Sequence, residues 1–318
     1  MKIFVTGGAG FIGSNYVRWV FANTDHEVTV YDSLTYAGNL STLKDVDDSP
    51  RFKFVKGNIC QPGDVESAMA GHDAVVHFAA ESHVDRSIAG SEDFILTNCF
   101  GTNVVIDAAR RLNISRVLHI GTDEVYGSVE TGSSREGDPL EPRSPYSASK
   151  AGSDLIALSY FSTHGTPVVV TRCTNNFGPF QYPEKAIPLF TTNLLDGKKI
   201  PLYGDGLNER DWIYVDDHCS GVHLALEHGK PGEIYNIGGG TELTNLELTH
   251  RLLEQFNKGE EFIEPVQDRL GHDRRYSVDW TKIQRELGYT PLRSIEMDLP
   301  EIVHWYKSNE QWWRPLKK

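Results

Sequence analysis

The chain alternates short β-branched runs with longer segments, and this rhythm restricts the fold more than any other feature of the sequence. Each run has the length of a strand, and each intervening segment is long enough for a helix. The runs are KIFVTG (2–7), EVTVYD (27–32), FKFV (52–55), AVVHFAA (74–80), RVLHIGT (116–122) and PVVVTR (167–172). Several are apolar at consecutive positions, as expected when helices cover both faces of a sheet. The alternation predicts an α/β fold with a Rossmann-type, doubly wound parallel sheet.

The rhythm weakens after Arg172, which indicates a second lobe. Residues that break regular elements become frequent there, namely Pro179, Pro183, Pro188, Pro201 and the stretch 204–206. A further strand pattern, EIYNIGG (233–239), precedes a helix pattern at 245–255. We predict a Rossmann domain over residues 1–172, rejoined by segments within about 207–239, and a smaller C-terminal lobe made mainly of residues 173–318.

The net charge of the chain is strongly negative. Its 31 Lys and Arg residues are outnumbered by 44 Asp and Glu residues, which gives a formal charge of −13. Bulk attraction to nucleic acid or to an anionic membrane is therefore not expected. An anionic ligand would need a local basic pocket.

The cysteines and the N-terminus indicate the compartment. The four cysteines are far apart and form no CxxC pair, so neither a disulfide framework nor a zinc site is predicted. The first residues enter a strand pattern at once, which leaves no room for a signal peptide. No apolar run approaches the roughly 20 residues of a membrane helix. We expect a soluble, cytoplasmic protein without a metal site.

A glycine-rich turn follows the first strand run and predicts a dinucleotide site. Gly7, Gly10 and Gly13 lie at three-residue spacing in TGGAGFIG, directly before a helical stretch. Glycines allow the backbone to approach a pyrophosphate, and the helix N-terminus offers free N–H groups. The second strand run ends in Asp32, whose carboxylate can bind ribose hydroxyls and would repel a 2′-phosphate, so NAD is favoured over NADP. The alternative is an ordinary βα turn with Asp32 as a helix cap.

Tyr146 and Lys150 form a candidate acid–base pair. They lie in a stretch that predicts a helix starting near Pro145, and an i, i+4 pair shares one helical face. A free phenol, with a pKa of about 10, is a poor base at pH 7. A nearby lysine and an oxidised nicotinamide ring both stabilise phenolate, which could then take a hydroxyl proton as hydride leaves the same carbon. The alternative is an ordinary surface pair.

Thr122, Asp123 and Glu124 follow the fifth strand run and form the second candidate group. On a regular strand, adjacent carboxylates point to opposite faces. Both can meet one substrate only where the strand ends, at the carboxyl edge where such sheets bind ligands. One hydroxyl and two carboxylates can supply a hydrogen-bond donor, a general acid and a general base. The alternative is that Asp123 or Glu124 only caps the next segment.

With these residues, the chain resembles the extended short-chain dehydrogenase/reductase family and, within it, the dTDP-glucose 4,6-dehydratases. The likeness spans nearly the whole chain. Its motifs are TGGAGFIGS, YDSLTYAGNL, HFAAESHVDRS, GTDEVYG, SPYSASKAGSD, TRCTNNFGP, PEKAIPLF, NERDWIYVDDHC, EIYNIGGG and RLGHDRRYSVD. Related epimerases share the glycine-rich and Tyr-x-x-x-Lys motifs in outline, whereas the Asp-Glu pair after Thr is typical of dehydratases.

The resemblance implies NAD as cofactor, dTDP-glucose as substrate and a role for each candidate residue. Tyr146 would remove the C4 hydroxyl proton while hydride passes to NAD, with Lys150 on the cofactor ribose and Thr122 on the C4 oxygen. The C4 ketone acidifies the C5 hydrogen. Glu124 would then act as base at C5 and Asp123 as acid on the departing C6 hydroxyl, before hydride returns to C6. The product is a 4-keto-6-deoxy sugar.

The resemblance also carries over binding residues by position. The implied NAD contacts are Gly7, Gly10, Phe11, Ile12, Gly13, Asp32, Thr35, Asn58, Ile59, Ala79, Ala80, Thr97, Tyr146, Lys150 and Asn176. The implied sugar-nucleotide contacts are Ser82, Thr122, Asn175, Lys185, Pro201, Tyr203, Arg210, Asn245, Asp268, Arg269 and His272. The chain departs from the family pattern at Asn58 (usually Asp), Ser33 (often Lys) and Leu270 (usually Pro).

The leading hypothesis is an NAD-dependent hydro-lyase that converts dTDP-glucose to dTDP-4-keto-6-deoxyglucose. A nucleotide-sugar 4-epimerase is the first alternative, since it uses the Tyr-Lys pair without elimination. A non-catalytic NAD-sensing regulator on the same fold is the second. The resemblance further implies a homodimer through helices near residues 97–112 and 146–163.

Overall fold

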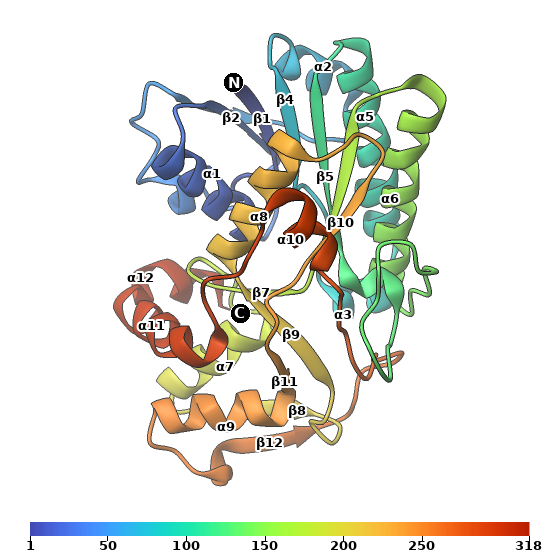
Figure 1. Cartoon of the computed structure of the whole chain (residues 1–318). Coiled ribbons are helices and arrows are strands. Elements are labelled where there is room, and N and C mark those ends of the chain that lie inside the picture. Colours follow the sequence, from blue (N-terminus) through green and yellow to red (C-terminus); the bar gives the residue numbers. More distant parts are fainter. Residues whose placement is uncertain (318) are drawn as a thin grey trace.

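A parallel sheet of seven strands forms the centre of the larger lobe (Figure 1). The computed structural model describes residues 1–317. In spatial order the strands are β10 (Ile234–Ile237), β6 (Val168–Cys173), β5 (Arg116–Thr122), β4 (Ala74–His77), β1 (Lys2–Thr6), β2 (Glu27–Asp32) and β3 (Phe52–Lys56). Neighbouring strands are parallel throughout. Each strand-like run of the first half thus became a strand of this sheet, and the run at 233–239 supplied β10.

Helices cover both faces of the sheet, because its strands are apolar on both faces. Successive residues of β1 belong to different cores: Ile3 and Val5 pack on one side, and Phe4 packs on the other. On the first side lie α1 (Phe11–Asn23) and α8 (Val215–His228). On the second side lie α2 (Pro62–Met69), α5 (Thr102–Arg111) and α6 (Pro145–His164). The predicted doubly wound fold class is confirmed.

The strand order reverses between β1 and β4, and this topology positions the site. From β1 the chain proceeds to β2 and β3 in one direction, and then to β4, β5 and β6 in the other. The loops leaving β1 and β4 therefore part from each other, and a crevice opens at the carboxyl ends of the strands.

The smaller lobe lies below the carboxyl edge of the large sheet in Figure 1. It contains a three-stranded sheet of β11 (Glu242–Thr244), β9 (Glu209–Tyr214) and β7 (Asn175–Phe177), and a pair of β12 (Ile263–Val266) and β8 (Ile200–Tyr203). Its helices are α7 (Ala186–Leu195), α9 (Asn245–Gln255), α11 (Ile295–Ser308) and α12 (Glu310–Trp313). The chain crosses between the lobes more than once, since β9 joins the small sheet whereas α8 and β10 return to the large one.

Shorter elements complete the fold. They are η1 (Leu40–Leu43), α3 (Val84–Ala89), α4 (Glu92–Phe94), η2 (Ile95–Gly101), η3 (Asp123–Tyr126), η4 (Glu260–Phe262), α10 (Thr281–Leu287) and η5 (Arg314–Leu316). Of these, η2 is a π-helical segment that runs directly into α5, and η3 is the 3₁₀ turn that follows β5.

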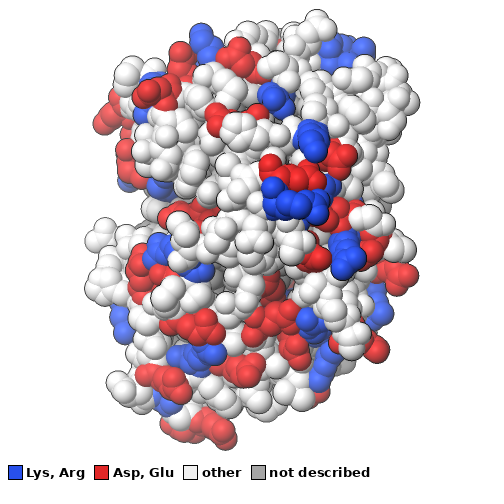
Figure 2. All heavy atoms as spheres, viewed as in Figure 1, with Lys and Arg blue, Asp and Glu red and all other residues white. Residues whose placement is uncertain are grey.

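Acidic side chains gather over the lower lobe on the face drawn in Figure 2, and basic ones are scattered among them without a continuous basic patch. This distribution agrees with the formal charge of −13. Among residues 1–317, no helix has the length and apolar character needed to cross a membrane.

Candidate active site

The glycine-rich turn between β1 and α1 leaves a space that a dinucleotide phosphate can enter. Gly7 has a φ of +71°, and a Cβ there would lie 2.6 Å from the Ala79 nitrogen. A Cβ on Gly13 would lie 2.3 Å from the Gly7 carbonyl oxygen. At Gly10 a Cβ would make an ordinary van der Waals contact with the Gly7 carbonyl oxygen at 3.4 Å, and this glycine lines the cavity. No side chain caps the first N–H groups of α1, and Phe11, Ile12 and Gly13 of its first turn line the same cavity.

Asp32 is fixed at the carboxyl end of β2 by two backbone donors. Its Oδ2 accepts from the Ala9 N–H at 3.0 Å, and its Oδ1 accepts from the Leu34 N–H at 2.8 Å. Burial raises the pKa of Asp32, while these two N–H groups oppose the rise. Each oxygen keeps a free lone pair, so the carboxylate fits a pair of ribose hydroxyls. Asp32 does not cap a helix in this structure.

One continuous cavity runs along the carboxyl edge from Asp32 to Lys185. Its walls include every residue predicted to contact the cofactor: Gly7, Gly10, Phe11, Ile12, Gly13, Asp32, Thr35, Asn58, Ile59, Ala79, Ala80, Thr97, Tyr146, Lys150 and Asn176. Thr122, Asp123 and Glu124 lie on the same walls, as do Ser82, Asn175 and Lys185. The cofactor end and the candidate catalytic end are therefore joined.

The departure at Asn58 keeps a local turn at the cofactor end. The Asn58 Oδ1 accepts from the Cys60 N–H at 2.9 Å, as an aspartate oxygen would. Its amide group remains on the cavity wall and can both donate and accept there. Leu270, at another departure, is 74% exposed.

A tight turn brings Asp123 and Glu124 to the same cavity. β5 ends at Thr122, and η3 begins at Asp123. The Thr122 hydroxyl donates to Asp123 Oδ1 at 3.2 Å and accepts from the Glu124 N–H at 3.4 Å. Thr122 therefore caps this turn, and neither carboxylate does. Because the strand alternation ends here, both carboxylates can approach one ligand.

The two carboxylates have different electrostatic surroundings. Asp123 is 3% exposed, and its Oδ2 has no hydrogen-bond partner among the described residues. Burial, followed by the adjacent Glu124, raises the pKa of Asp123 well above its usual value. Burial also raises the pKa of Glu124, but Arg210, Lys185 and Arg269 oppose that rise. The surroundings thus favour the protonated form of Asp123 more strongly than that of Glu124.

Tyr146 stands at the start of α6 because of a local capping motif. Ser144 and Ser147 form a reciprocal capping box, and Pro145 occupies the first helical turn. Tyr146 is buried. Burial first and Glu124 second raise the pKa of its phenol, although the nearby Thr122 hydroxyl lowers it, so phenolate formation requires additional positive charge in the cavity.

Lys150 lies one helical turn after Tyr146 on the same wall. Its ammonium donates to the Ile120 carbonyl oxygen at 2.6 Å, which holds the side chain against β5. Burial lowers the pKa of Lys150, and the nearby Asp154 carboxylate opposes this effect. The predicted pair therefore occupies the cavity rather than the surface.

A buried polar network behind the site was not predicted from the sequence. Asp154 Oδ2 accepts from Arg172 Nε at 2.8 Å, and Arg172 Nη1 donates to the Tyr126 hydroxyl at 2.8 Å. Tyr126 in turn donates to Asn236 Oδ1 at 2.8 Å. Tyr126 ends the η3 turn that carries both carboxylates. The available signal was a charged residue, Arg172, within an apolar strand run.

His218 is a second missed residue, and it orients Asn176. Burial lowers the pKa of His218 to about 3, so its ring is neutral at pH 7. The two side chains are joined at 2.9 Å between His218 Nδ1 and Asn176 Oδ1, and the amide nitrogen of Asn176 donates to the Thr174 carbonyl at 3.0 Å. Both ends of the Asn176 amide are thereby fixed at the cavity wall.

The predicted substrate residues fall into two sets, one that lines the cavity and one that lies outside its walls. Lys185 donates to the Ser82 carbonyl oxygen at 2.7 Å beside the cavity. Arg269 forms a bidentate pair with Asp85 at 2.6 and 2.9 Å and lies over the Tyr203 ring. Next to Tyr203, His272 bonds Asp268 at 2.7 Å.

Arg210 and Arg269 both act on the charge of Glu124, so they link the small lobe to the catalytic end. The Arg210 guanidinium donates to the Glu209 and Asp273 carbonyl oxygens at 2.7 and 3.0 Å. Within residues 1–317, no hydrogen bond or ion pair joins the side chains of Pro201 or Asn245 to the other predicted substrate residues.

Comparisons with known proteins decide the family. The model of the family described as GDP-mannose 4,6 dehydratase matches residues 4–302. The chain belongs to this family. A dTDP-glucose 4,6-dehydratase from Actinoplanes sp. is 56% identical, with 98% of this chain and 100% of the relative covered. The predicted place in the extended short-chain dehydrogenase/reductase family, next to the dTDP-glucose 4,6-dehydratases, is confirmed.

Solved structures support the same placement. The crystal structure of DesIV, a dTDP-glucose 4,6-dehydratase from Streptomyces venezuelae with NAD and TYD bound, is 55% identical, with a TM-score of 0.98 and all of both chains covered. A UDP-glucose 4-epimerase from Thermotoga maritima, solved with UDP-glucose, is 29% identical, with a TM-score of 0.90 over 98% of this chain and 100% of that one. The fold alone therefore does not separate dehydratase from epimerase.

Proposed function

We propose that this protein is an NAD-dependent dTDP-glucose 4,6-dehydratase, a hydro-lyase that forms dTDP-4-keto-6-deoxyglucose. The observation that carries the proposal is the placement of Asp123 and Glu124, in unlike electrostatic surroundings, on one cavity wall with Tyr146. Relatives bearing this name, at 52–56% identity over nearly their full length, bear out the predicted function. Neighbouring dehydratase structures with NAD bound bear out the predicted cofactor.

The cofactor end fits NAD in three respects. The glycine-rich turn on the cavity wall and the N–H groups of α1, which no side chain caps, suit a pyrophosphate. The Asp32 carboxylate suits ribose hydroxyls and would repel a 2′-phosphate. Asn176 offers a fixed amide at the nicotinamide end. When bound, NAD supplies a hydride acceptor at C4, a hydride donor at C6, and a positive ring charge beside the Tyr146 phenol.

At C4, this proposal gives Tyr146 the role of base. The buried phenol would give up its own proton only with positive charge nearby, and would then take the proton of the C4 hydroxyl. The Thr122 hydroxyl, which lies near Tyr146, would hydrogen-bond the C4 oxygen. Lys150 would bind the cofactor ribose and contribute positive charge to the phenol.

The elimination would divide between the two carboxylates. Glu124, whose charge is supported by Lys185, Arg210 and Arg269, would remove the C5 proton made acidic by the C4 ketone. Asp123, whose pKa is raised by burial and by the adjacent carboxylate, would transfer a proton to the C6 oxygen as the C–O bond breaks. The departing oxygen leaves as water, and C5 regains a proton after the C6 position is reduced.

The three cations near Glu124 also provide the local positive charge that a chain of net charge −13 requires for an anionic substrate. We assign the sugar end of the substrate to Ser82, Thr122 and Asn175, near the carboxylates, with Lys185 beside them. The nucleotide end is assigned to Pro201, Tyr203, Arg210, Asn245, Asp268, Arg269 and His272. On this basis residues 1–172, with the returning segments, hold the cofactor, and residues 173–318 mainly hold the substrate.

The alternatives lack a supporting observation. A 4-epimerase needs Tyr146 and Lys150, but it gives no role to a buried proton donor at Asp123. A regulator without catalysis gives no role to the whole set of acid–base groups that shares the cavity.

The exposed apolar residues support a homodimer. Ile95, Leu96 and Phe100 on η2, with Leu155 on α6, are each 45–59% exposed, and these two elements pack together. Such an apolar surface on neighbouring helices is typical of an interface. The expected dimer would be measured by analytical ultracentrifugation, with Leu155→Glu shifting it toward monomer. A cytoplasmic location stays a prediction from the separated cysteines.

The function is tested with dTDP-glucose and purified protein. We expect the alkali-sensitive absorbance of a 4-keto sugar to appear without net consumption of NAD. A parallel incubation with UDP-glucose is assayed for UDP-galactose by chromatography. Absence of the 4-keto signal, or formation of a 4-epimer in its place, would overturn the proposal.

A further inference from the structure

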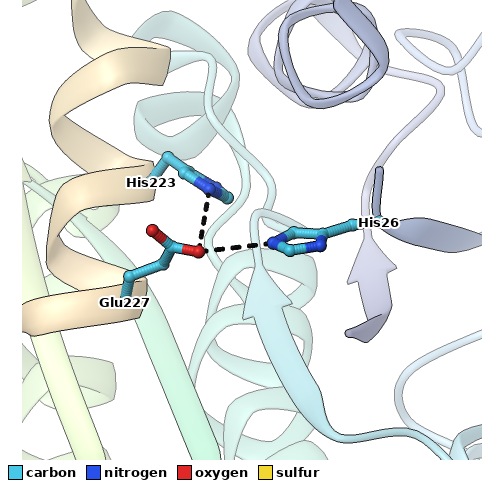
Figure 3. Close-up of side chains that lie close together, drawn as sticks. All are labelled: His26, His223 and Glu227. Carbon is cyan, nitrogen blue, oxygen red and sulfur yellow. Dashed lines mark hydrogen bonds and ion pairs between the residues drawn. The ribbon is translucent and has the colours of Figure 1, made fainter. Parts of the chain in front are cut away.

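Three potential metal ligands converge at the amino edge of the large sheet (Figure 3), and none of them lines the carboxyl-edge cavity. His26 directly precedes β2, and His223 and Glu227 lie one turn apart near the end of α8. Their ligand atoms all lie within 4.8 Å of one another. His26 and Glu227 are 201 residues apart, so cysteine spacing and sequence motifs gave no sign of this group.

The separations fit a tetrahedral ion better than a strong ion pair. Glu227 Oε1 lies 3.3 Å from His26 Nε2 and 3.5 Å from His223 Nε2. Zn²⁺ bound at about 2.0–2.1 Å places neighbouring tetrahedral ligands about 3.3–3.4 Å apart. Charge-assisted N–H···O bonds are shorter, at about 2.7–2.9 Å. In Figure 3 both imidazoles turn toward the same carboxylate oxygen. Rotation of the partly buried His26 ring can shorten the third separation, that between the ligand nitrogens of His26 and His223.

An outer contact of His223 also suits a metal ligand. Its other ring nitrogen lies 3.2 Å from the buried Tyr16 hydroxyl. Such outer contacts fix the ring orientation of metal-binding histidines. The Glu227 side chain is 34% exposed, so solvent can supply a fourth ligand.

We propose that His26, His223 and Glu227 form a binding site for Zn²⁺ or a similar divalent transition-metal ion. Two imidazoles and one carboxylate are a ligand set that Zn²⁺ accepts, with water in the fourth position. The bound ion would tie the loop before β2 to α8 and so stabilise the packing of α1 against α8. The proposal contradicts the expectation of no metal site and does not depend on the proposed function.

The test is a zinc titration of metal-free protein purified without an affinity tag, using a chromophoric competitor. We expect one ion per chain and a melting temperature that rises with Zn²⁺ and falls again with chelator. Replacing Zn²⁺ by Co²⁺ should give the visible absorption of a tetrahedral site. Removing a ligand in His26→Ala or Glu227→Gln should weaken zinc binding by more than about tenfold.

His250→Ala is the matched control. His250 also pairs with a glutamate, Glu260, at 3.7 Å, but among the described residues this exposed pair is not part of a three-residue ligand group. This variant should bind zinc as the unaltered chain does. His26 and Glu227 are partly exposed, so both variants are expected to fold, which circular dichroism would verify. Equal zinc affinity in His26→Ala, Glu227→Gln and the parent protein, or an octahedral Co²⁺ spectrum, would overturn the proposal.

Discussion

The change Asp154→Asn would remove the buried carboxylate that pairs with Arg172. Both side chains are almost fully buried, at 0% and 2% exposed, and their Nε–Oδ2 distance is 2.8 Å. The substitution keeps the volume of the side chain but removes its charge, so the Arg172 guanidinium loses its buried counter-ion. Loss of one partner from a buried ion pair costs about 3–5 kcal/mol.

This cost corresponds to a measurable fall in thermal stability. For a chain of 318 residues, an unfolding entropy of roughly 2.1 cal/mol/K per residue gives a drop of roughly 5–7 °C in melting temperature. Catalysis should suffer too, because Arg172 holds Tyr126 at the end of the η3 turn and Asp154 supports the charge of Lys150. We expect kcat to fall while KM for the sugar nucleotide stays nearly unchanged.

Differential scanning calorimetry and steady-state kinetics would measure both effects. Asp107→Asn is the control. Like Asp154, Asp107 pairs with arginine, in this case with Arg110 and Arg111, but the pairs lie on an exposed helix face. Surface pairs contribute about 0–1 kcal/mol, so the control should melt within roughly 1.5 °C of the parent protein. If Asp154→Asn melted as the control does and kept its kcat, the network would have no role in holding the turn.

Three further predictions concern the cavity. Tyr146→Phe should lower the rate of the first hydride transfer by about 10²–10⁴-fold, seen as absent NADH absorbance in a single turnover, whereas Tyr160→Phe on the same helix should react normally. Asp123→Asn or Glu124→Gln should still oxidise C4 and accumulate bound NADH; no reduced cofactor in either variant would contradict their assignment to elimination. Because burial holds the His218 pKa near 3, below its unfolded value of about 6.5, stability should fall as pH drops below 6.5. In urea titrations His218→Gln should lose about 2 kcal/mol less between pH 7.5 and 5 than the parent chain, and equal losses would refute this reasoning.

The features that the sequence predicted share a local origin. The strand runs, the glycine turn before α1, and the helix from Pro145 each depend on residues adjacent in the chain. Asp32 could be placed because it ends the strand that follows this turn. The roles of the cofactor and substrate residues came from resemblance, and their contacts with ligands stay predictions.

The features that could not be predicted depend on contacts between distant residues. Arg269 pairs with Asp85 across 184 positions, and His218 reaches Asn176 across 42. The spacing of these residues in the sequence does not indicate which side chains will pair. The pairs form only when the two lobes pack together at the carboxyl edge of the large sheet. A charged residue inside an apolar run, such as Arg172, was the one readable sign that a buried partner existed.

Thr122, Asp123 and Glu124 show where local and distant effects meet. Strand alternation alone would have placed the two carboxylates on opposite faces. The strand ends at Thr122, and Gly127 allows the following turn to close, since its φ is +75° and a Cβ there would lie 2.3 Å from the Glu141 carbonyl oxygen. That glycine was visible in the sequence, but the Arg172–Tyr126 bond that holds the turn was not. The acid and base assignments therefore depend on a turn that the sequence could suggest and that the Thr122 cap and the buried network behind it together hold in place.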